Sequence, residues 1–429
     1  MIKKILILTD TWGPASANVT CVKNVINCIK DDIHISVSAF EGPSPCPQDK
    51  YRSLDFHTIA PTRARQLYYL SDAVAKTDPM LSNRLKAKAA FFSKLKRIKN
   101  IFSYPITCKS FSIKWAKQIE TLLQKQHFDC IISVCAPEES MYTGYLIKQK
   151  YPQIKWLIHL IDEGSHRQFS SNFYYIEKML APKSMFQWRE FIKASDGIII
   201  MKCHENHYRL PFFKEVQDKI TVLDVPLLQT DIHSLPASTL DKEFNTNIEN
   251  WVYTGNLNTL YYNPEPICRM FLKYSENKNA MLHFFGRGDA TTYITKMQEK
   301  YPTKIKFWGF CQHDQISTYL QNANVLIYWR SKPMSSVSGK FFDYLSYGKP
   351  IIYFTTEQQD VNTPYVSKYT GGLIVRFTDS LEEQIAQIDN FLCKKPVIDI
   401  DEVKKLYYAS TPQATAAYIQ SKLFNKSTN

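Results

Sequence analysis

The chain has 429 residues, of which 44% are hydrophobic and 22% are charged, and its formal net charge is +13. This length exceeds what one hydrophobic core supports, so we expect about two domains, and the hydrophobic content is enough to bury a large core. No run of about 20 apolar residues occurs, which excludes a membrane-spanning helix.

The first half of the chain alternates apolar strands with helices. Residues 4–9 are predicted to form a buried strand rather than a signal peptide, because the apolar run covers only 5–8. Further strands are predicted at 34–40, 128–134, 155–162, 197–201 and 220–223, and helices at 18–29, 81–126, 137–151 and before Ala194. Residues 41–80 begin with a Pro-rich stretch that we interpret as irregular. Strands that alternate with helices predict a parallel sheet covered on both faces.

A basic amphipathic segment occupies residues 81–119. From 79 to 119 the chain contains no Asp or Glu and carries +10 of the net charge. Its large apolar residues recur at helical spacing, namely Phe91, Leu95, Ile98 and Phe102. The cations around them include Lys94, Lys96, Arg97 and Lys99. This pattern is typical of a helix on an anionic membrane surface, which we favour over a helix packed on its own domain. Nucleic acid is not an expected partner, because the aromatic residues share one face.

The second half repeats the alternation after an aperiodic stretch at 226–248, which we interpret as a linker. Strands are predicted at 251–255, 281–285, 305–309, 325–329, 351–354 and 373–375. Helices are predicted between them, including 316–321 and one that begins near Pro264. We therefore expect an N-terminal domain at 1–225, the linker, a second domain at 249–405 and a C-terminal helix at 406–429.

The motif at 337–352 carries the most chemical information. A small-residue turn with Ser338 and Lys340 precedes a short helix that contains Asp343, and a Gly-Lys-Pro turn then leads into an apolar strand. Backbone N–H groups at a helix start and a nearby lysine suit a diphosphate. A carboxylate one turn later can accept hydrogen bonds from a ribose diol. The motif therefore indicates a nucleotide site.

The same motif resembles the Ser-Lys-x-x-Glu-Tyr-Leu-x-x-Gly-Lys-Pro-x-Ile signature of family-four (group 1) glycosyltransferases of surface polysaccharide biosynthesis. The resemblance covers most of 249–376. It implies an α/β protein of the GT-B fold, with two Rossmann-like domains that face each other across a cleft and C-terminal helices that pack back on the N-terminal domain. It also implies a metal-independent, retaining transfer of sugar from a nucleotide diphosphate sugar to a glycan or polyprenol-linked acceptor, without a cofactor.

The resemblance assigns a set of donor-binding residues. Lys340 would neutralise the diphosphate, Ser338 would hydrogen-bond it, and Asp343, in the place of the family's Glu, would hold the ribose hydroxyls. The turn that contains Gly13 is expected to approach the donor phosphate or the acceptor. The other expected donor-binding residues are Gly255, Asn256, Gly286, Arg287 and Phe310.

Two positions depart from the family pattern. Ser335 stands where retaining members carry a second Glu, and residues 258–262 lack the Arg and Lys that many members have after the first glycine turn. Arg330, Lys332 or Arg287 would then supply the missing positive charge. Because of these departures, both retaining and inverting mechanisms stay open.

Asp162 and Glu163 are the candidate catalytic residues, since they follow a predicted strand of the N-terminal half. In an inverting enzyme a carboxylate or a His would deprotonate the acceptor hydroxyl. For Asp162 a helix-capping role is equally well supported. Glu138 and Glu139 are interpreted instead as a charged first helical turn.

The histidines are interpreted as structural. His159 lies within a predicted strand and is expected to be a core residue. His204 and His207 are spaced for a shared metal ion, but no third ligand accompanies them, so we interpret both as surface residues and expect no metal. Asp399 is expected to cap a helix rather than to belong to a metal-binding Asp-x-Asp motif.

These inferences predict a cytoplasmic protein, peripheral on the inner face of the cytoplasmic membrane, that binds a nucleotide-sugar donor and a glycan or lipid-linked acceptor. Two alternatives stay open. One is a nucleotide-sugar epimerase or hydrolase on the same fold, and the other is a non-catalytic scaffold subunit that retains the fold.

Overall fold

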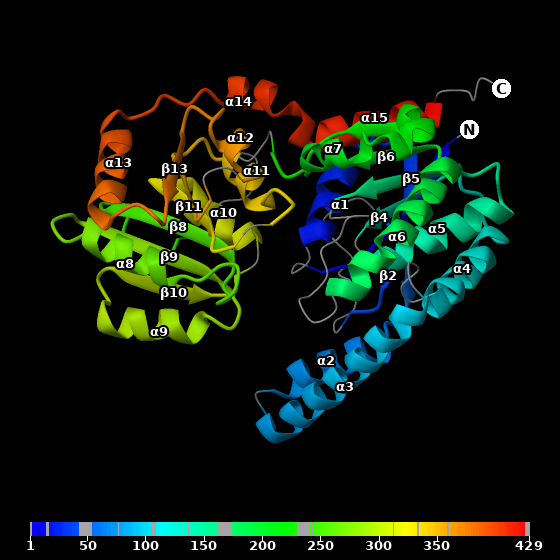
Figure 1. The fold of residues 1–429 in the computed structure, drawn as a ribbon, viewed down its shortest axis with the longest axis horizontal. Helices are drawn as coiled ribbons and strands as arrows, with labels where there is room; N and C mark the ends of the chain where they lie inside the picture. The colour runs from blue at the N-terminus through cyan, green and yellow to red at the C-terminus, as the bar shows by residue number, and fades with distance from the viewer. Residues whose placement is uncertain are drawn as a thin grey trace. The chain divides into compact units, whose positions relative to one another are not determined.

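The computed structural model describes residues 2–13, 17–42, 54–75, 77–103, 109–135, 137–161, 174–229, 240–241, 243–311, 313–332, 334–357 and 360–424. They form two compact units. The first unit comprises Met1–Pro226 and Pro412–Asn429, and the second comprises Leu227–Thr411. Each unit is built around one parallel β-sheet that is flanked by helices (Figure 1).

The first unit contains a seven-stranded sheet of order β3-β2-β1-β4-β5-β6-β7. Its strands are β1 (Lys3–Leu8), β2 (Ile33–Phe40), β3 (Asp55–Ile59), β4 (Cys130–Cys135), β5 (Lys155–Leu160), β6 (Gly197–Ile200) and β7 (Ile220–Val222). In this sheet β2 and β3 lie on one side of β1, whereas β4 to β7 lie on the other side. The carboxyl ends of β1 and β4 therefore form a topological switch point, where open α/β sheets bind ligands.

Helices cover both faces of this sheet, as the alternation of the sequence predicted. They are α1 (Ala17–Cys28), α2 (Arg63–Val74), α3 (Pro79–Ser103), α4 (Lys109–Leu123), α5 (Glu138–Lys150), α6 (Tyr174–Ala194), α7 (Glu205–Tyr208) and α15 (Pro412–Phe424), with the 3-10 helices η2 (Lys202–His204) and η3 (Pro211–Lys219). Trp115 of α4, Met141 of α5 and Phe191 of α6 pack in one core with the strands. Their burial removes apolar surface from water and thereby stabilises the unit.

Two elements lie where the sequence prediction placed none. β3 pairs in parallel with β2, from Ser36 opposite Asp55 to Phe40 opposite Ile59. The helix α2 follows β3 and packs along α3. The sequence pattern predicted no element for these residues, because β3 is stabilised by pairing with β2 and α2 by packing on α3 rather than by a strong local pattern.

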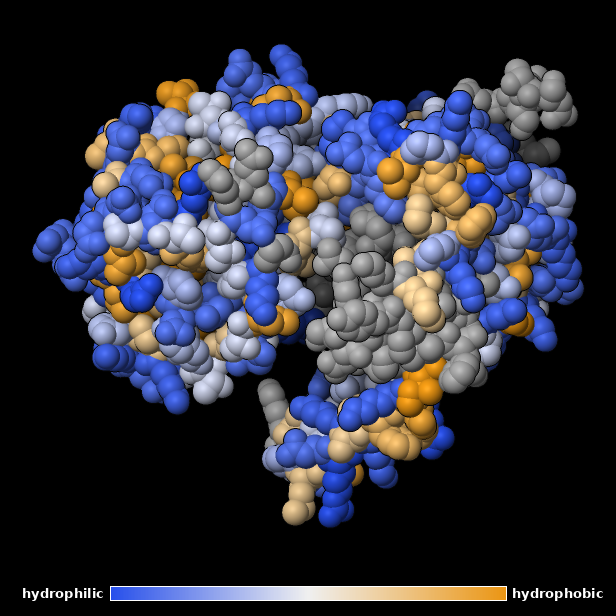
Figure 2. Space-filling view, viewed as in Figure 1, coloured by the Kyte–Doolittle hydropathy of each residue, from blue (hydrophilic) through white to orange (hydrophobic). Residues whose placement is uncertain are grey.

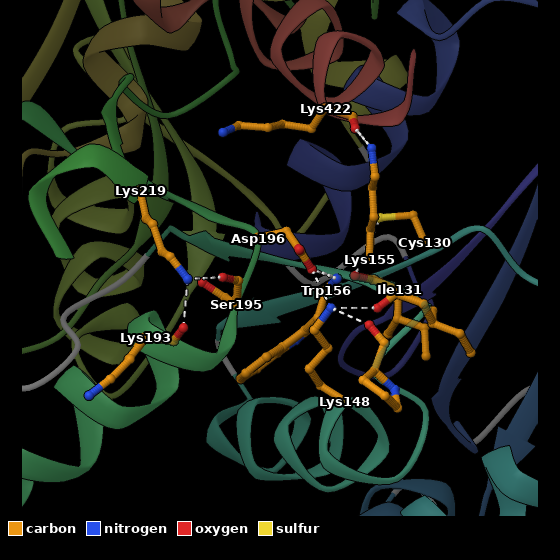
Figure 3. Close-up of polar contacts among 12 residues, drawn as sticks. Cys130, Ile131, Lys148, Lys155, Trp156, Lys193, Ser195, Asp196, Lys219 and Lys422 are labelled. Carbon is orange, nitrogen blue, oxygen red and sulfur yellow. Dashed lines mark hydrogen bonds and ion pairs between the residues drawn. The ribbon is translucent and has the colours of Figure 1, made fainter. Parts of the chain in front are cut away.

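The C-terminal helix α15 packs on the first unit beside α1, which confirms the expected return of the chain to the N-terminal domain. Lys155 at the start of β5 donates a hydrogen bond from Nζ to the backbone carbonyl of Lys422 in α15 (Figure 3). Nearby, the Asp196 carboxylate accepts hydrogen bonds from the Trp156 N–H and from Lys148 Nζ, both at 2.8 Å. The Lys155–Lys422 contact fastens the last helix to the start of β5, and the Asp196 contacts join the start of β5 to α5.

The second unit contains a six-stranded sheet of order β10-β9-β8-β11-β12-β13. Its strands are β8 (Glu249–Asn256), β9 (Ala280–Arg287), β10 (Ile305–Gly309), β11 (Val325–Arg330), β12 (Ile351–Thr355) and β13 (Gly372–Arg376). Its helices are α8 (Glu265–Tyr274), α9 (Thr291–Lys300), α10 (His313–Asn322), α11 (Gly339–Leu345), α12 (Thr363–Val366), α13 (Leu381–Cys393) and α14 (Ile400–Leu406), with the 3-10 helix η5 (Tyr408–Ser410). The switch point of this sheet lies between β8 and β11, directly beside α11.

Gly144 offers a test of the packing between α5 and the sheet. Alanine ordinarily stabilises a helix interior by about 1 kcal/mol relative to glycine. At Gly144, however, a Cβ would lie 2.3 Å from Trp156 Nε1 and 2.4 Å from Ser133 Oγ, and these two groups are hydrogen-bonded to each other. We expect Gly144→Ala to lower the free energy of unfolding by about 1–3 kcal/mol, measured by urea denaturation. The control is Gly13→Ala, whose Cβ would have nothing within 4 Å; equal stability of both variants would contradict this packing.

Candidate functional site

The glycine at the end of β8 brings the backbone against a lysine. Gly255 has φ +127°, and a Cβ at this position would lie 2.2 Å from Lys340 Cε. Only glycine tolerates both this backbone conformation and this close approach. Gly286 stands opposite Gly255 in the sheet register, and its Cβ would lie 1.9 Å from the Gly255 carbonyl oxygen. The structure therefore brings Gly255, Gly286 and Lys340 together at the switch point.

Lys340 is held in an aromatic and largely desolvated environment. Its Nζ lies 4.6 Å from the centroid of the Tyr262 ring and 5.5 Å from that of Tyr253. Burial, together with the charge of Arg330, lowers the pKa of Lys340 to about 8, although the carboxylate of Asp343 opposes this shift. The site thus holds a lysine that carries its positive charge near neutral pH at a cost in free energy.

Arg330 is the second cation of this site. It is the last residue of β11 and only 3% exposed, and its Nε and Nη1 have no hydrogen-bond partner in the part of the chain that the structure describes. A buried guanidinium without partners is unfavourable. Two neighbouring cations in a low-dielectric environment favour an anion that binds both, and a guanidinium suits phosphate oxygens in particular.

The structure distinguishes among the three cations that were expected to compensate for the missing Arg and Lys. Arg330 is close enough to Lys340 for its charge to contribute, after burial, to the lowered pKa of the lysine. Lys332 is exposed. Arg287 is also exposed and lies at the end of β9, with its guanidinium 4.9 Å from the ring centroid of Phe310. Arg330 is therefore the residue that adds charge next to the lysine.

The turn before α11 is held by a hydrogen bond to the buried side-chain amide of Asn362. Ser338 precedes α11, and its side chain makes no capping hydrogen bond to the helix. The Ser338 N–H donates to Asn362 Oδ1 at 2.9 Å. Asn362 is fully buried, and its Nδ2 donates to Tyr353 Oη at 3.2 Å. The backbone that leads to Lys340 is thus held by a hydrogen-bonded network of the β12–α12 region.

Asp343 and Tyr344 lie on α11 itself. Asp343 is half-buried, and it is close enough to Lys340 for its carboxylate to raise the pKa of the lysine. Tyr344 Oη accepts a hydrogen bond from the Thr254 N–H at 2.9 Å, which fastens α11 to β8. The helix α11 therefore carries both Lys340 and Asp343, close to each other.

The other residues expected to bind the donor lie at the carboxyl ends of neighbouring strands. Asn256 ends β8, and its carbonyl accepts a hydrogen bond from Tyr253 Oη. Phe310 follows β10, is 49% exposed and lies under the Arg287 guanidinium. This arrangement forms an exposed aromatic and cationic surface on the same edge of the sheet as Gly286.

The first unit holds the remaining candidates. Gly13 follows β1, near its switch point. In the preceding turn Asp10 Oδ1 accepts hydrogen bonds from Arg65 Nη1 at 2.6 Å and from the Thr11 N–H at 2.7 Å. The candidate catalytic residues Asp162 and Glu163 lie outside the described residues.

Several structural interpretations can be assessed directly. His159 is buried, and desolvation lowers its pKa to about 4, so it is a neutral core residue. His204 is also buried, with 1% exposure, so its interpretation as a surface residue was wrong. Glu138 and Glu139 form the acidic first turn of α5. Asp399 caps α14 by accepting hydrogen bonds from two backbone N–H groups.

The basic segment forms α3 and α4, and the exposed face of α3 carries both apolar and charged side chains. α2 and α3 lie side by side and extend away from the sheet of the first unit (Figure 1). Large apolar side chains of α3 are exposed, namely Phe91, Leu95 and Ile98 at 59%, 45% and 51%. Figure 2 shows hydrophobic and hydrophilic residues intermixed on this pair of helices. Among the described residues, no helix is long and apolar enough to cross a membrane.

The four cations predicted to contact a membrane differ in their placement. Lys94 is exposed on α3. Lys96 Nζ lies 3.4 Å from Glu139 Oε1 of α5, so this lysine faces its own domain. The side chains of Arg97 and Lys99 lie outside the described residues, although both belong to α3. The outward cations that the structure describes on this helix include Arg84, Lys86 and Lys88.

Comparisons with known proteins identify the fold. No family model and no curated protein sequence matches this chain. Anabaena HepE, solved in complex with UDP and glucose, matches with 13% identity over 97% of this chain and 95% of its own, at a TM-score of 0.56. Sucrose-phosphate synthase from Thermosynechococcus elongatus matches with 14% identity over 99% and 95%, at 0.55. UDP-GlcNAc 2-epimerase from Methanocaldococcus jannaschii matches with 11% identity over 97% and 99%, at 0.54.

At this level of identity the likeness defines the fold class. The chain has the GT-B fold, with two α/β units that each contain one parallel sheet. The site residues that the sequence did not reveal are Tyr253, Tyr262 and Asn362, because contact with the motif at 337–352 arises only in the folded chain. Arg330 was one of the three cations named from the sequence in place of the missing Arg and Lys.

The lowered pKa of Lys340 predicts a stability difference that depends on pH. At about pH 7 the lysine is charged in the folded and the unfolded state, and burial disfavours this charge. Lys340→Met should therefore raise the free energy of unfolding of the ligand-free protein by about 1–3 kcal/mol at that pH. Between about 8 and 10.5 the folded lysine is neutral while the unfolded one stays protonated, so the wild type gains stability with rising pH and the advantage of the variant shrinks.

The measurement is urea denaturation at about pH 7 and again at about pH 9.5. The exposed neighbour Lys332, changed to Met, serves as the control and should show no comparable gain at either pH. A Lys340→Met variant that is equally stable or less stable than the wild type at about pH 7 would argue against a desolvated lysine.

Proposed function

We propose that this protein is a glycosyltransferase that moves a sugar from a nucleotide diphosphate sugar to a glycan or polyprenol-linked acceptor in surface polysaccharide assembly. The observation that supports the donor most directly is the pair of desolvated cations, Lys340 and Arg330, at the switch point of the second sheet. A diphosphate supplies the charge that this pair lacks. The fold is compatible with this assignment. Of two proteins that share it, HepE was solved in complex with UDP and glucose, and the other is a sucrose-phosphate synthase.

In the proposed reaction the protein stabilises the leaving group rather than activating it with a metal. As the bond between the sugar and the diphosphate breaks, negative charge accumulates on the phosphate oxygens. Lys340 and Arg330 are positioned before the reaction starts, so their charges favour the transition state without further reorganisation. Asp343 would accept hydrogen bonds from the ribose hydroxyls, and Ser338 would donate one to the diphosphate.

Fewer observations support the roles proposed for residues near the sugar and the acceptor. Gly255, Gly286 and Asn256 line the donor edge of the sheet in this proposal, and Arg287 with Phe310 borders the nucleobase. Asp162 or Glu163 would deprotonate the acceptor hydroxyl in an inverting reaction. Retention of configuration is the outcome that the resemblance of 337–352 favours, and product analysis of the anomeric linkage distinguishes the two.

The outer face of α3 supports a peripheral location on the inner face of the cytoplasmic membrane. Phe91, Leu95 and Ile98 would enter the interface between headgroups and acyl chains, and the neighbouring exposed cations would contact anionic headgroups. Such a location would place the first unit near a lipid-linked acceptor. The ion pair of Lys96 with Glu139 removes that lysine from the proposed contact.

An epimerase is the second candidate, because a UDP-GlcNAc 2-epimerase shares the fold. The two reactions differ in their requirement for an acceptor. A transferase releases nucleoside diphosphate from the sugar nucleotide at a rate that depends on added acceptor lipid or glycan, whereas an epimerase isomerises the donor alone. Chromatography of the sugar nucleotide, with and without acceptor, separates them.

Removing either buried cation should weaken nucleotide binding. We expect Lys340→Ala and Arg330→Met to reduce the affinity for UDP by about 10- to 100-fold, since each removes a charge-assisted contact. Isothermal titration calorimetry of folded protein at about pH 7 measures this. Lys332→Ala changes an exposed lysine two residues from Arg330 and should bind UDP like the wild type. A wild type that binds neither UDP nor GDP would overturn the proposed function and favour a scaffold.

Neutralising the outer cations of α3 should weaken membrane binding. We expect the triple change of Arg84, Lys88 and Lys94 to Gln to reduce partitioning onto anionic vesicles by about 100-fold at low salt, at roughly 1 kcal/mol per cation. Co-sedimentation with phosphatidylglycerol-containing vesicles measures this. The matched control changes three exposed lysines of the second unit, Lys296, Lys368 and Lys394, to Gln. Equal sedimentation of the two triple variants would refute the membrane contact of α3.

A further inference from the structure

The segment 258–262, which lacks the expected cations, instead contributes an aromatic ring to the site. Its backbone is fixed at several points. Asn258 Oδ1 accepts hydrogen bonds from the N–H groups of Tyr261 at 2.7 Å and Leu260 at 3.2 Å. The Ser331 N–H donates to the Tyr261 carbonyl at 2.8 Å. This segment is therefore held against the residues that follow β11.

The Tyr262 side chain is fixed as well. The Tyr262 N–H donates to the Asn258 carbonyl at 3.1 Å, and Oη donates to Met334 Sδ at 3.8 Å. In this position the face of the ring lies 4.6 Å from Lys340 Nζ. Tyr253 of β8 presents a second ring to the same ammonium at 5.5 Å. Lys340 thus lies within contact distance of two aromatic faces.

An aromatic face attracts a cation through the negative electrostatic potential above the ring, and the attraction grows when water is excluded. It does not attract the neutral amine in the same way. The rings therefore favour the charged form of Lys340 and also restrict where its Nζ lies. A hydrated ammonium on a four-carbon stem would otherwise have many conformations.

We propose that Tyr262 is a positioning residue that keeps Lys340 charged and aimed at the donor diphosphate. This inference rests on the proposed function. In place of the Arg and Lys that 258–262 lacks, this segment then contributes a ring that favours the charged form of Lys340.

The other charged groups near Lys340 also change the stability of its charged form. Arg330 of β11 repels its charge, and Asp343 of α11 attracts it. Burial opposes the charged form and is the largest contribution. Tyr253 lies on β8 and is fully buried, so its replacement would disturb the core. Tyr262 is only half-buried in a loop, which makes it the ring that can be changed with the least effect on folding.

The test is the pH dependence of UDP affinity, measured by calorimetry from about pH 7 to about pH 9.5. In the wild type we expect affinity to fall as pH rises through about 8, where Lys340 loses its proton. In Tyr262→Leu this fall should occur about 0.5 to 1 pH unit lower, so that the affinity at about pH 8 drops several-fold while that at about pH 7 changes less. Tyr262→Phe keeps the ring and should restore the wild-type profile.

Two further variants make the outcome decisive. Tyr261→Leu changes the exposed neighbouring tyrosine and should leave the profile unshifted. Tyr262→Met is a second non-aromatic variant, used if Tyr262→Leu does not fold. An unshifted profile in the non-aromatic variant, or a shifted one in Tyr262→Phe, would overturn the role of the ring. A wild type that binds no UDP at any of these pH values would instead refute the proposed function, and the inference with it.

Discussion

The candidate site depends on two positive charges that the folded chain holds out of water next to each other. Lys340 and Arg330 come from a helix and from the end of a strand, and burial together with mutual repulsion disfavours both charges in the free protein. Folding must therefore supply the free energy that keeps them together, and it does so through the surrounding aromatic and hydrogen-bonded structure. A ligand with a compact negative charge would relieve this unfavourable arrangement, which is why we propose an anion for this site.

Other residues of the second unit hold Lys340 in its position. Gly255 lets the lysine stem pass directly over the strand end, and Asn362 fixes the turn that precedes α11. Tyr344 joins α11, which carries the lysine, to β8, which carries the glycine. These contacts connect β8, and through Asn362 also β12, to one short helix. The precision of the site thus comes from the sheet, because strands hold side chains more rigidly than loops do.

The fold itself does not determine the reaction. A sucrose-phosphate synthase and a UDP-GlcNAc 2-epimerase share it with this chain, so the fold is compatible with more than one reaction. The two proposed reactions differ in whether an acceptor receives the sugar. The exposed apolar residues and cations on the outer face of α3 are the feature from which we propose a lipid-linked acceptor.

The sequence by itself determined the alternation of strands and helices, the parallel sheets and the turn, helix and strand of 337–352, because these depend on local periodicity and on residues close in the chain. It did not predict β3 and α2, which are stabilised by pairing with β2 and by packing on α3. Only the tertiary structure decided that Arg330, rather than Lys332 or Arg287, lies beside Lys340, that Lys96 turns inward to Glu139, and that Tyr262 faces the lysine. The physical reason is that burial, and hence the strength of a charge, is a property of the neighbours that folding brings together.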